Sequence, residues 1–267
     1  MREGKKTTKN LSIILVNYQS INQLKECLFS LEKFLGNINL IKELIIVNNE
    51  ISKLNLEITN FSWPVKIIEL GKNIGFGSAN NLAAQQASGK FLWLLNPDTL
   101  IVDQSIEQAV NLLENNQKIG IISPLIIEAK TKQPQSWVGG RQTTLWEIIF
   151  RNTFGQPWTK KTLSFVDWVS GTSMILKKEL FHKLSGFDEN FFMYFEDQDL
   201  CLRAKNLGFK IAFFPNSRII HQNGSSWSNK KEQKDHYRQS QVYFFQKHRP
   251  SWEGKILFWV QKMFPFH

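Results

Sequence analysis

Three carboxylates crowd into four residues at Glu196, Asp197 and Asp199, directly after the aromatic run 191–195. A partly dry setting raises the pKa of a carboxyl group and makes it a more useful proton acceptor. On a helix, Asp197 and Asp199 point to different sides, so one can face a site while the other serves structure. We take Asp197 as the candidate base, with Glu196 and Asp199 as alternatives. The competing interpretation is that these acids only stabilise a helix N-terminus.

A second candidate is Asp98, in the turn Asn96-Pro97-Asp98 that follows the apolar run 91–95. Proline restricts the backbone here and leaves Asp98 at the strand end. Its carboxylate suits a hard divalent cation that also binds a diphosphate. The same residue types are common in ordinary turns, which is the alternative interpretation. The glycine-rich segment 71–77 matches neither standard phosphate-loop pattern.

These residues need a scaffold, and the hydrophobic pattern predicts one. Apolar runs that are rich in β-branched residues indicate buried strands, and helical spacing between them indicates helices. We expect strands at 11–16, 44–47, 65–70, 91–95, 119–122, 174–176 and 210–214, the last ended by Pro215, and helices at 21–35, 79–87, 105–115, 178–184 and 196–207. Apolar strands alternating with helices predict an α/β fold, a mostly parallel sheet covered on both faces.

Polar clusters occur where several of the predicted strands end: Asn17-Tyr18, Asn48-Asn49, 73–77 and 96–98. In open α/β sheets, ligands bind beyond the carboxyl ends of the strands. The coincidence therefore predicts a binding site along this edge. His221, beside Gly224 and two serines, follows the last predicted strand in the same way.

Composition limits the function classes. The 267 residues are 42% hydrophobic and carry a net charge of +10, which nucleic acid, an anionic membrane or a phosphorylated substrate would each match. No nucleic-acid-binding motif accompanies the charge, so we expect no nucleic acid partner. Two isolated cysteines, Cys27 and Cys201, favour a reducing cytoplasm. We expect no signal peptide and no membrane span.

Taken together, the motifs resemble glycosyltransferase family 2, most closely its rhamnosyltransferase-like members, over roughly residues 11–227. The block from Gly186 to Arg203 is the most specific part of the resemblance. The matching residues are Val16-Asn17-Tyr18 with Ser20, Asn73-Ile74-Gly75-Phe76-Gly77 with Asn80-Asn81, Leu95-Asn96-Pro97-Asp98, Gly171, Gly186-Phe187-Asp188-Glu189, Phe192-Met193-Tyr194-Phe195-Glu196-Asp197-Gln198-Asp199-Leu200, Arg203, and His221 with Gly224 and Ser226.

The resemblance implies a GT-A fold and an inverting transfer of a sugar from a nucleotide-diphosphate donor to a glycan or lipid-linked acceptor. It implies that Asp197 acts as base, and that Asp98 and His221 hold Mg2+ or Mn2+. Trp168 and Gly171 would lie on the acceptor side. The donor-binding residues would be Asn17, Tyr18, Asn48, Asn73, Gly75, Phe76, Asn80, Asn96 and Asp98.

One position departs from the family. An aspartate usually reads the nucleobase where this chain has Asn48, although an amide can also hydrogen-bond a pyrimidine. The departure puts donor identity in doubt. It also keeps open an alternative function, a catalytically silent nucleotide-sugar-binding or scaffold protein of the same fold.

The chain divides into a polar tail (1–10), the transferase domain (11–227, with a nucleotide-sugar half at 11–123 and an acceptor half at 124–227) and a basic, aromatic helical extension (228–267). We interpret 130–165 as a long acceptor-side excursion. Basic residues on one side of the extension and Trp and Phe on the other predict peripheral contact with the inner face of the membrane. The alternatives are packing on the protein's own core or on a second subunit.

Overall fold

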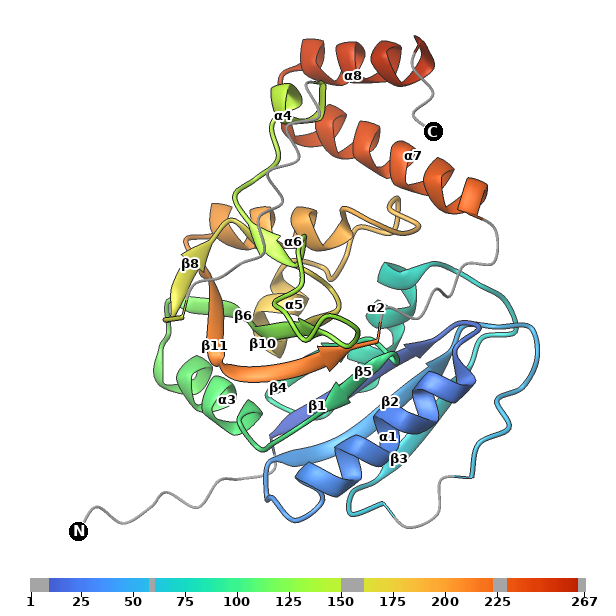
Figure 1. Cartoon of the computed structure of the whole chain (residues 1–267), viewed down its shortest axis with the longest axis vertical. Helices are drawn as coiled ribbons and strands as arrows, with labels where there is room; N and C mark the ends of the chain where they lie inside the picture. Colours follow the sequence, from blue (N-terminus) through green and yellow to red (C-terminus); the bar gives the residue numbers. More distant parts are fainter. Residues whose placement is uncertain (1–9, 58–60, 150–160, 223–229, 264–267) are drawn as a thin grey trace.

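A computed structural model describes residues 10–57, 61–149, 161–222 and 230–263. One large mixed sheet forms the centre of the protein, and two C-terminal helices stand beyond its upper edge (Figure 1). The strand order is β3 (Val65–Glu69), β2 (Ile41–Asn48), β1 (Leu11–Asn17), β4 (Phe91–Leu95), β10 (Ser173–Lys177), β6 (Ile119–Glu128), β11 (Lys210–His221) and β5 (Thr99–Ile101), with β8 (Ser164–Val166) paired to β11.

The predicted α/β class is confirmed. Strands β3, β2, β1 and β4 run parallel to one another, and β6 runs parallel to β11. Strand β10 is antiparallel to both β4 and β6, and β5 and β8 are antiparallel to β11. Strand β10 therefore joins two parallel groups. Its antiparallel direction was not predicted, because a short apolar run carries no information about strand direction.

Helices cover both faces of the sheet. Side chains alternate along β1, so Ile13 and Leu15 face one core while Ile14 and Val16 face the other. On the first face lie α1 (Ile21–Leu35) and α3 (Ile106–Asn115). On the second lie α2 (Phe76–Gln86), α5 (Lys178–Lys183) and α6 (Glu196–Asn206). Both cysteines are buried and free in these cores.

Two strand predictions were too short. Strand β6 continues to Glu128, and β11 passes Pro215 and ends at His221. The β6–β11 register shifts between Phe214 and Arg218, and this irregularity accommodates the proline within the strand. The second part of β11 then pairs with β5, which had not been predicted, and sets His221 opposite Thr99.

The described part of the excursion at 130–165 contains regular structure. Strand β7 (Gly139–Gly140) pairs with β9 (Trp168–Val169), and α4 (Leu145–Ile149) follows. Residues 150–160 of the excursion lie outside the described part of the chain. The predicted C-terminal extension forms two helices, α7 (Lys230–His248) and α8 (Ser251–Met263).

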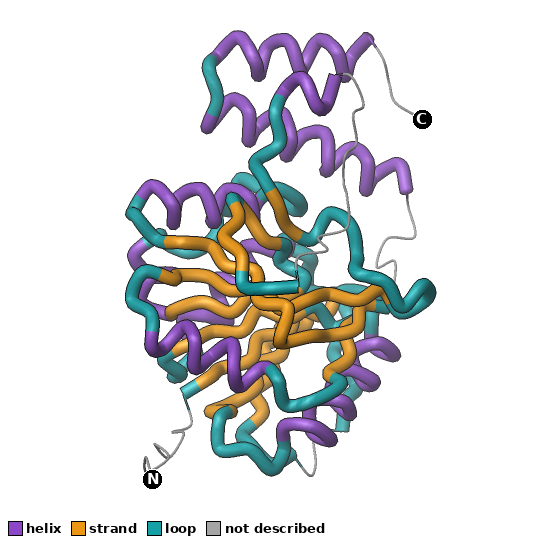
Figure 2. The backbone as a smooth tube through the Cα atoms, turned by 60° about the vertical axis from the view of Figure 1, so that its left-hand side comes forward, coloured by secondary structure: helices purple, strands orange, loops and turns teal. Residues whose placement is uncertain are grey.

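The C-terminal helices share a third, smaller core with the rest of the protein. It joins Leu145 of α4 and Phe191 and Phe195 of the loop before α6 to Phe244 of α7 and Leu257 of α8. Figure 2 shows the same stacking from another side, with α7 between α8 and the main body. Within the described helices, none is both long and apolar enough to cross a membrane.

Candidate active site

A network of asparagines occupies the carboxyl ends of β1 and β2. The Asn17 Nδ2 group donates to Asn48 Oδ1 at 2.9 Å and to Glu50 Oε1 at 2.9 Å. Asn48 Nδ2 donates to Glu69 Oε2 at 2.6 Å. Asn17 and Asn48 are both 1% exposed, so these amides are held rigidly at the sheet edge. Tyr18 follows Asn17 at the same edge.

Two carboxylates that the sequence analysis did not select therefore belong to this network, Glu69 bonded to Asn48 and Glu50 bonded to Asn17. Glu69 ends β3 directly beside Asn48, and Glu50 also accepts from the backbone N–H of Gln19 at 2.6 Å. The departure from the usual aspartate at Asn48 was the available signal. Because Asn48 lacks the usual negative charge, a nearby acidic residue could be expected to supply it. The sequence could not identify Glu69 as that neighbour, because its proximity depends on the pairing of β2 with β3.

The glycine turn connects this edge to the loop before α6. Gly75 has a φ of 89°, and a Cβ there would lie 2.5 Å from the Phe192 carbonyl oxygen, so only glycine fits. The Phe76 N–H donates to that oxygen at 3.0 Å. Asn73 Oδ1 accepts from the Gly75 N–H at 3.0 Å, and Asn80 Nδ2 donates to the Phe76 carbonyl at 2.9 Å. These hydrogen bonds determine the shape of the turn. That Asn73, Gly75, Phe76 and Asn80 contact the nucleotide-sugar donor stays a prediction.

Asp98 and His221 come together although 123 positions separate them. His221 Nε2 lies 3.1 Å from Asp98 Oδ1, and its Nδ1 lies 2.8 Å from Gln135 Oε1. Pairing of β11 with β5 produces this contact, because it aligns His221 with Thr99. With Nδ1–H donating to the Gln135 oxygen, Nε2 is the ring nitrogen that a cation beside Asp98 would bind. This second-sphere arrangement is typical of a metal-binding histidine.

The pair fits a divalent cation that takes part of its coordination from its substrate. Among the described residues, no group of three or more His, Cys, Asp or Glu side chains is placed to hold a metal ion. Mg2+ typically binds one or two protein carboxylates together with substrate phosphates. Asp98 and His221 therefore suit a metal that binds with a diphosphate better than a resident structural ion.

The candidate base Asp197 lies in the first turn of α6. Its Oδ2 accepts from the Gly171 N–H at 3.0 Å, and its Oδ1 accepts from the Gln198 N–H at 2.7 Å. Gly171 packs against the ring of Phe76, where an added Cβ would lie 3.0 Å from a ring carbon. Burial raises the pKa of Asp197, and the two N–H donors offset only part of that rise. The carboxyl group is therefore tuned toward proton acceptance.

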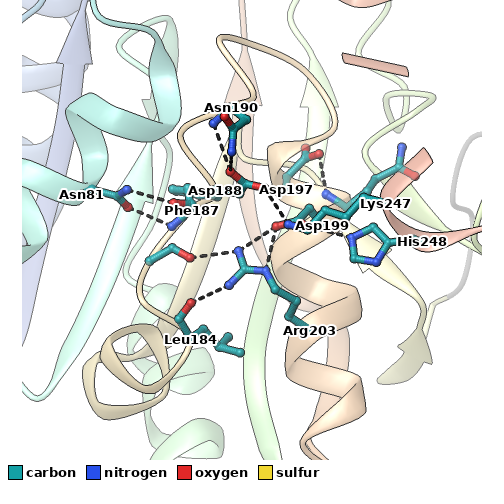
Figure 3. Close-up of polar contacts among 12 residues, drawn as sticks. Asn81, Leu184, Phe187, Asp188, Asn190, Asp197, Asp199, Arg203, Lys247 and His248 are labelled. Carbon is teal, nitrogen blue, oxygen red and sulfur yellow. Dashed lines mark hydrogen bonds and ion pairs between the residues drawn. The ribbon is translucent and has the colours of Figure 1, made fainter. Parts of the chain in front are cut away.

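Asp199 has a different environment. Its side chain is fully buried, and Figure 3 shows Arg203, Lys247 and His248 converging on it. The distances are 2.7 Å from Arg203, 2.6 Å from Lys247 Nζ and 2.7 Å from His248 Nε2. Burial raises its pKa, but the bond to His248 and the nearby cations outweigh that and lower it overall. A covered, ion-paired carboxylate of this kind is poorly suited to act as a base.

Glu196 is buried, and its Oε2 atom has no hydrogen-bond partner among the residues that the structure describes. Burial, followed by the charge of Asp197, raises the pKa of Glu196 well above the usual range for a glutamate. Because Glu196 and Asp197 are adjacent and buried, repulsion between their charges disfavours the state in which both are ionised. Glu196 thus remains the alternative base, and its protonated form is compatible with an ionised Asp197.

Trp168 is 7% exposed, and its Nε1 donates to the Arg141 carbonyl at 3.0 Å. It therefore anchors the excursion, and contact of its ring with the sugar acceptor stays a prediction.

Asn96 connects the Asp98 turn to the candidate base: its N–H donates to the Thr172 carbonyl at 2.9 Å. Thr172 directly follows Gly171, which contacts Asp197, so the 171–172 turn bridges the Asp98 turn and the candidate base.

The sequence analysis also did not predict that Lys247 and His248 lie at the site. Both lie in the last turn of α7, outside the region of resemblance, and contact Asp199 across 48 and 49 positions. Basic residues at a helix C-terminus are common, so no local signal distinguished them.

Comparison with known proteins identifies related chains. A family model described as glycosyltransferase-like family 2 matches residues 9–241. The chain is 22% identical to the N-acetylglucosaminyl-diphospho-decaprenol L-rhamnosyltransferase of Mycobacterium tuberculosis over 255 residues, which covers 85% of this chain and 83% of that protein. It is 26% identical to the rhamnosyltransferase WbbL of Escherichia coli K12 over 207 residues, covering 72% and 78%.

Solved structures agree on the fold. The crystal structure of GalNAc-T7 with UDP, GalNAc and Mn2+ superposes with a TM-score of 0.65 at 18% identity. The match covers 95% of this chain and 54% of that one, so the chain spans about half of that protein's length. The architecture is therefore the GT-A fold.

Proposed function

Because the chain belongs to glycosyltransferase family 2, we propose that it is an inverting glycosyltransferase that uses a nucleotide-diphosphate sugar donor. The acceptor is a hydroxyl of a glycan or lipid-linked saccharide, in cell-surface polysaccharide synthesis. One observation carries the proposal: the 171–172 turn bonds both to the candidate base Asp197 and to Asn96 beside Asp98. A base and a diphosphate-binding centre are thereby held by the same short turn.

The proposed reaction assigns the base to Asp197. The acceptor hydroxyl gives its proton to the Asp197 carboxylate while its oxygen bonds to the anomeric carbon of the donor sugar. The bond from that carbon to the diphosphate oxygen breaks, and the nucleoside diphosphate leaves with the electron pair. Attack opposite the leaving group inverts the anomeric centre. The raised pKa of Asp197 supports this role.

Asp98 and His221 would hold Mg2+ or Mn2+, with Gln135 orienting the histidine ring. Such an ion, when bound, stabilises negative charge on the departing diphosphate. GalNAc-T7, which shares the fold, was crystallised with Mn2+ and UDP, which supports a divalent metal here.

The donor nucleoside would lie at the asparagine network of Asn17 and Asn48, with Tyr18 beside it. The M. tuberculosis and E. coli relatives are both named rhamnosyltransferases, and the name of the first includes a diphospho-decaprenol lipid. Rhamnose is therefore the candidate sugar, and a lipid-linked acceptor is favoured. Glu50 and Glu69 supply the negative charge that the usual aspartate would bring.

We further propose that the enzyme works at the cytoplasmic face of the membrane, held there by α8. Its outward stripe is apolar: Trp252, Ile256, Trp259 and Met263 repeat at helical spacing and are 48%, 37%, 55% and 62% exposed. Gly254 and Leu257, on the opposite side of the helix, are buried. Lys255 and Lys262 flank the stripe and suit anionic headgroups, as in interfacial helices.

Sedimentation with anionic vesicles tests the membrane proposal. Trp259→Glu should lose most of the bound fraction, whereas Phe29→Glu, which alters an even more exposed ring on α1, should retain it. Equal binding by both variants would contradict the proposal. A concentration-dependent oligomer that Trp259→Glu dissociates would assign the stripe to a second subunit.

The activity is tested by incubating the protein with Mn2+, a lipid-linked acceptor and a panel of nucleotide sugars that includes nucleotide-activated rhamnose. We expect release of nucleoside diphosphate with one donor, and a product of inverted anomeric configuration by NMR. Asn48 motivates the alternative of a silent binder: donor binding without release for every donor would favour it.

A further inference from the structure

The backbone immediately before α6 is held in an unfavourable conformation. Tyr194 and Phe195 have φ angles of 70° and 64°, in the left-handed region that non-glycine residues rarely occupy. Such conformations persist only where surrounding contacts determine them, and they concentrate at functional sites. This turn sets the direction in which α6 begins, and therefore where Asp197 points.

Side chains of α7 contact this turn, residues 193–195. Ser240 Oγ donates to the Met193 carbonyl at 2.7 Å, and Gln233 Nε2 donates to the Tyr194 hydroxyl at 2.6 Å. Phe195 is buried, with the Phe244 ring centroid 5.5 Å from its own. Tyr237 adds a second α7 ring, 5.4 Å from Phe195. Each of the three turn residues is thus contacted by the same helix.

The last turn of α7 makes a second set of contacts, on the C-terminal side of Asp197. Lys247 Nζ bonds to Asp199 Oδ1 at 2.6 Å and to Asp188 Oδ2 at 2.6 Å, and His248 Nε2 bonds to Asp199 at 2.7 Å (Figure 3). Arg203 completes the cluster by donating to Asp199 and to the Gly186 carbonyl at 2.9 Å. Lys247 thereby ties the loop that starts at Gly186 to the helix that carries the base.

We propose that α7 is a positioning element of the active site, in which Ser240, Lys247 and His248 hold the first turn of α6 so that the Asp197 carboxylate stays against the Gly171 N–H. The proposal rests on the proposed role of Asp197 as base. Residues on both sides of Asp197, 193–195 and Asp199, are fixed by α7. By contrast, the hydrogen bonds that join Asn17 and Asn48 to each other and to Glu50 and Glu69 involve no α7 residue.

The test compares Lys247→Met with Lys234→Met, which removes an exposed lysine from the same helix. In Lys247→Met, kcat at saturating donor and acceptor should fall at least about tenfold, while the donor Kd stays within about twofold. Lys247→Arg, which retains the charge, should recover most of the rate. Lys234→Met should match the wild type in both quantities.

The pH profile separates positioning from a general loss of structure. A carboxylate that drifts from Gly171 loses an N–H bond that lowers its pKa, so the acidic limb of kcat should move to higher pH in Lys247→Met. NMR titration of the Asp197 carboxyl group should show the same upward shift. That measurement needs no turnover, so it also decides the proposal if the wild type proves inactive as a transferase.

Ser240→Ala provides an independent variant, because it removes the bond to Met193 without touching the buried charges. It should lower kcat less than Lys247→Met and move the acidic limb in the same direction. The proposal is overturned if Lys247→Met and Ser240→Ala keep kcat and the Asp197 titration unchanged. It is also overturned if kcat and donor affinity fall in parallel.

Discussion

The two sides of the candidate site are built differently. On the donor side, Asn17 and Asn48 end neighbouring parallel strands, and the β1–β2 register places them opposite each other. On the base side, Asp197 follows a left-handed turn and precedes a buried ion cluster that includes Lys247 of the C-terminal helix. The donor side is therefore set by sheet register, and the base side by contacts between distant segments.

Because the two sides are built differently, a substitution should affect different properties of the enzyme on each side. On the donor side a hydrogen bond between two neutral amides, Asn17 and Asn48, joins the strand ends, whereas the Asp199 cluster on the base side consists of ionised groups. A change on the base side should thus alter rate and stability, and a change on the donor side should alter affinity. The following predictions test that separation.

The largest effect is expected for Asp197→Asn. Loss of a general base should lower kcat by roughly 10²–10⁴-fold, with donor affinity little changed. Steady-state kinetics with a donor titration measures both. In the wild type, activity should fall as pH drops through the raised Asp197 pKa, so the acidic limb should lie above the usual aspartate range. Near-normal turnover would transfer the base role to Glu196.

Asp199→Asn should mainly destabilise the protein. Removing one partner of a buried ion cluster costs about 3–5 kcal/mol, because the cations are left unpaired. The folded-state pKa of Asp199 is lowered, so its stabilisation is complete above the unfolded value of about 3.9 and is lost as pH falls toward the folded one. Urea unfolding at neutral pH checks the difference, and a loss under 1 kcal/mol would contradict it.

Asp98→Asn should weaken donor binding only when Mn2+ is present. Gln135→Leu removes the partner of His221 Nδ1 and should lower metal affinity by about 10–100-fold, without removing a ligand. Calorimetric titration of Mn2+ with nucleoside diphosphate distinguishes the two. Metal-independent weakening by Asp98→Asn would indicate that the carboxylate acts on the fold instead.

The smallest effect is expected at Asn48. Restoring the usual aspartate with Asn48→Asp places a second negative charge beside Glu69, where Asn48 now donates at 2.6 Å. Donor affinity should fall several-fold, and the double variant with Glu69→Gln should recover it. A gain in affinity for Asn48→Asp alone would show that Glu69 does not supply the missing charge.

Much of the scaffold could be predicted because it depends on local pattern. Apolar runs predicted the strands at 11–16 and 91–95, and helical spacing predicted the helix at 21–35; the structure has them at Leu11–Asn17, Phe91–Leu95 and Ile21–Leu35. The polar clusters at strand ends predicted a site along that edge. Strand β11 could not be bounded, because Pro215 is a local stop signal that a register shift overrides. That extension is what brings His221 to Asp98.

The order of the main elements, the family and the hypothesis that Asp197 is the base could all be drawn from the sequence, since these depend on contiguous residue patterns. Tertiary structure alone decided the antiparallel insertion of β10, the pairing of His221 with Asp98, and the burial of Asp199 among Arg203, Lys247 and His248. The physical reason is sequence distance. Contacts between residues far apart in the chain arise from sheet pairing and core packing, which no local pattern specifies.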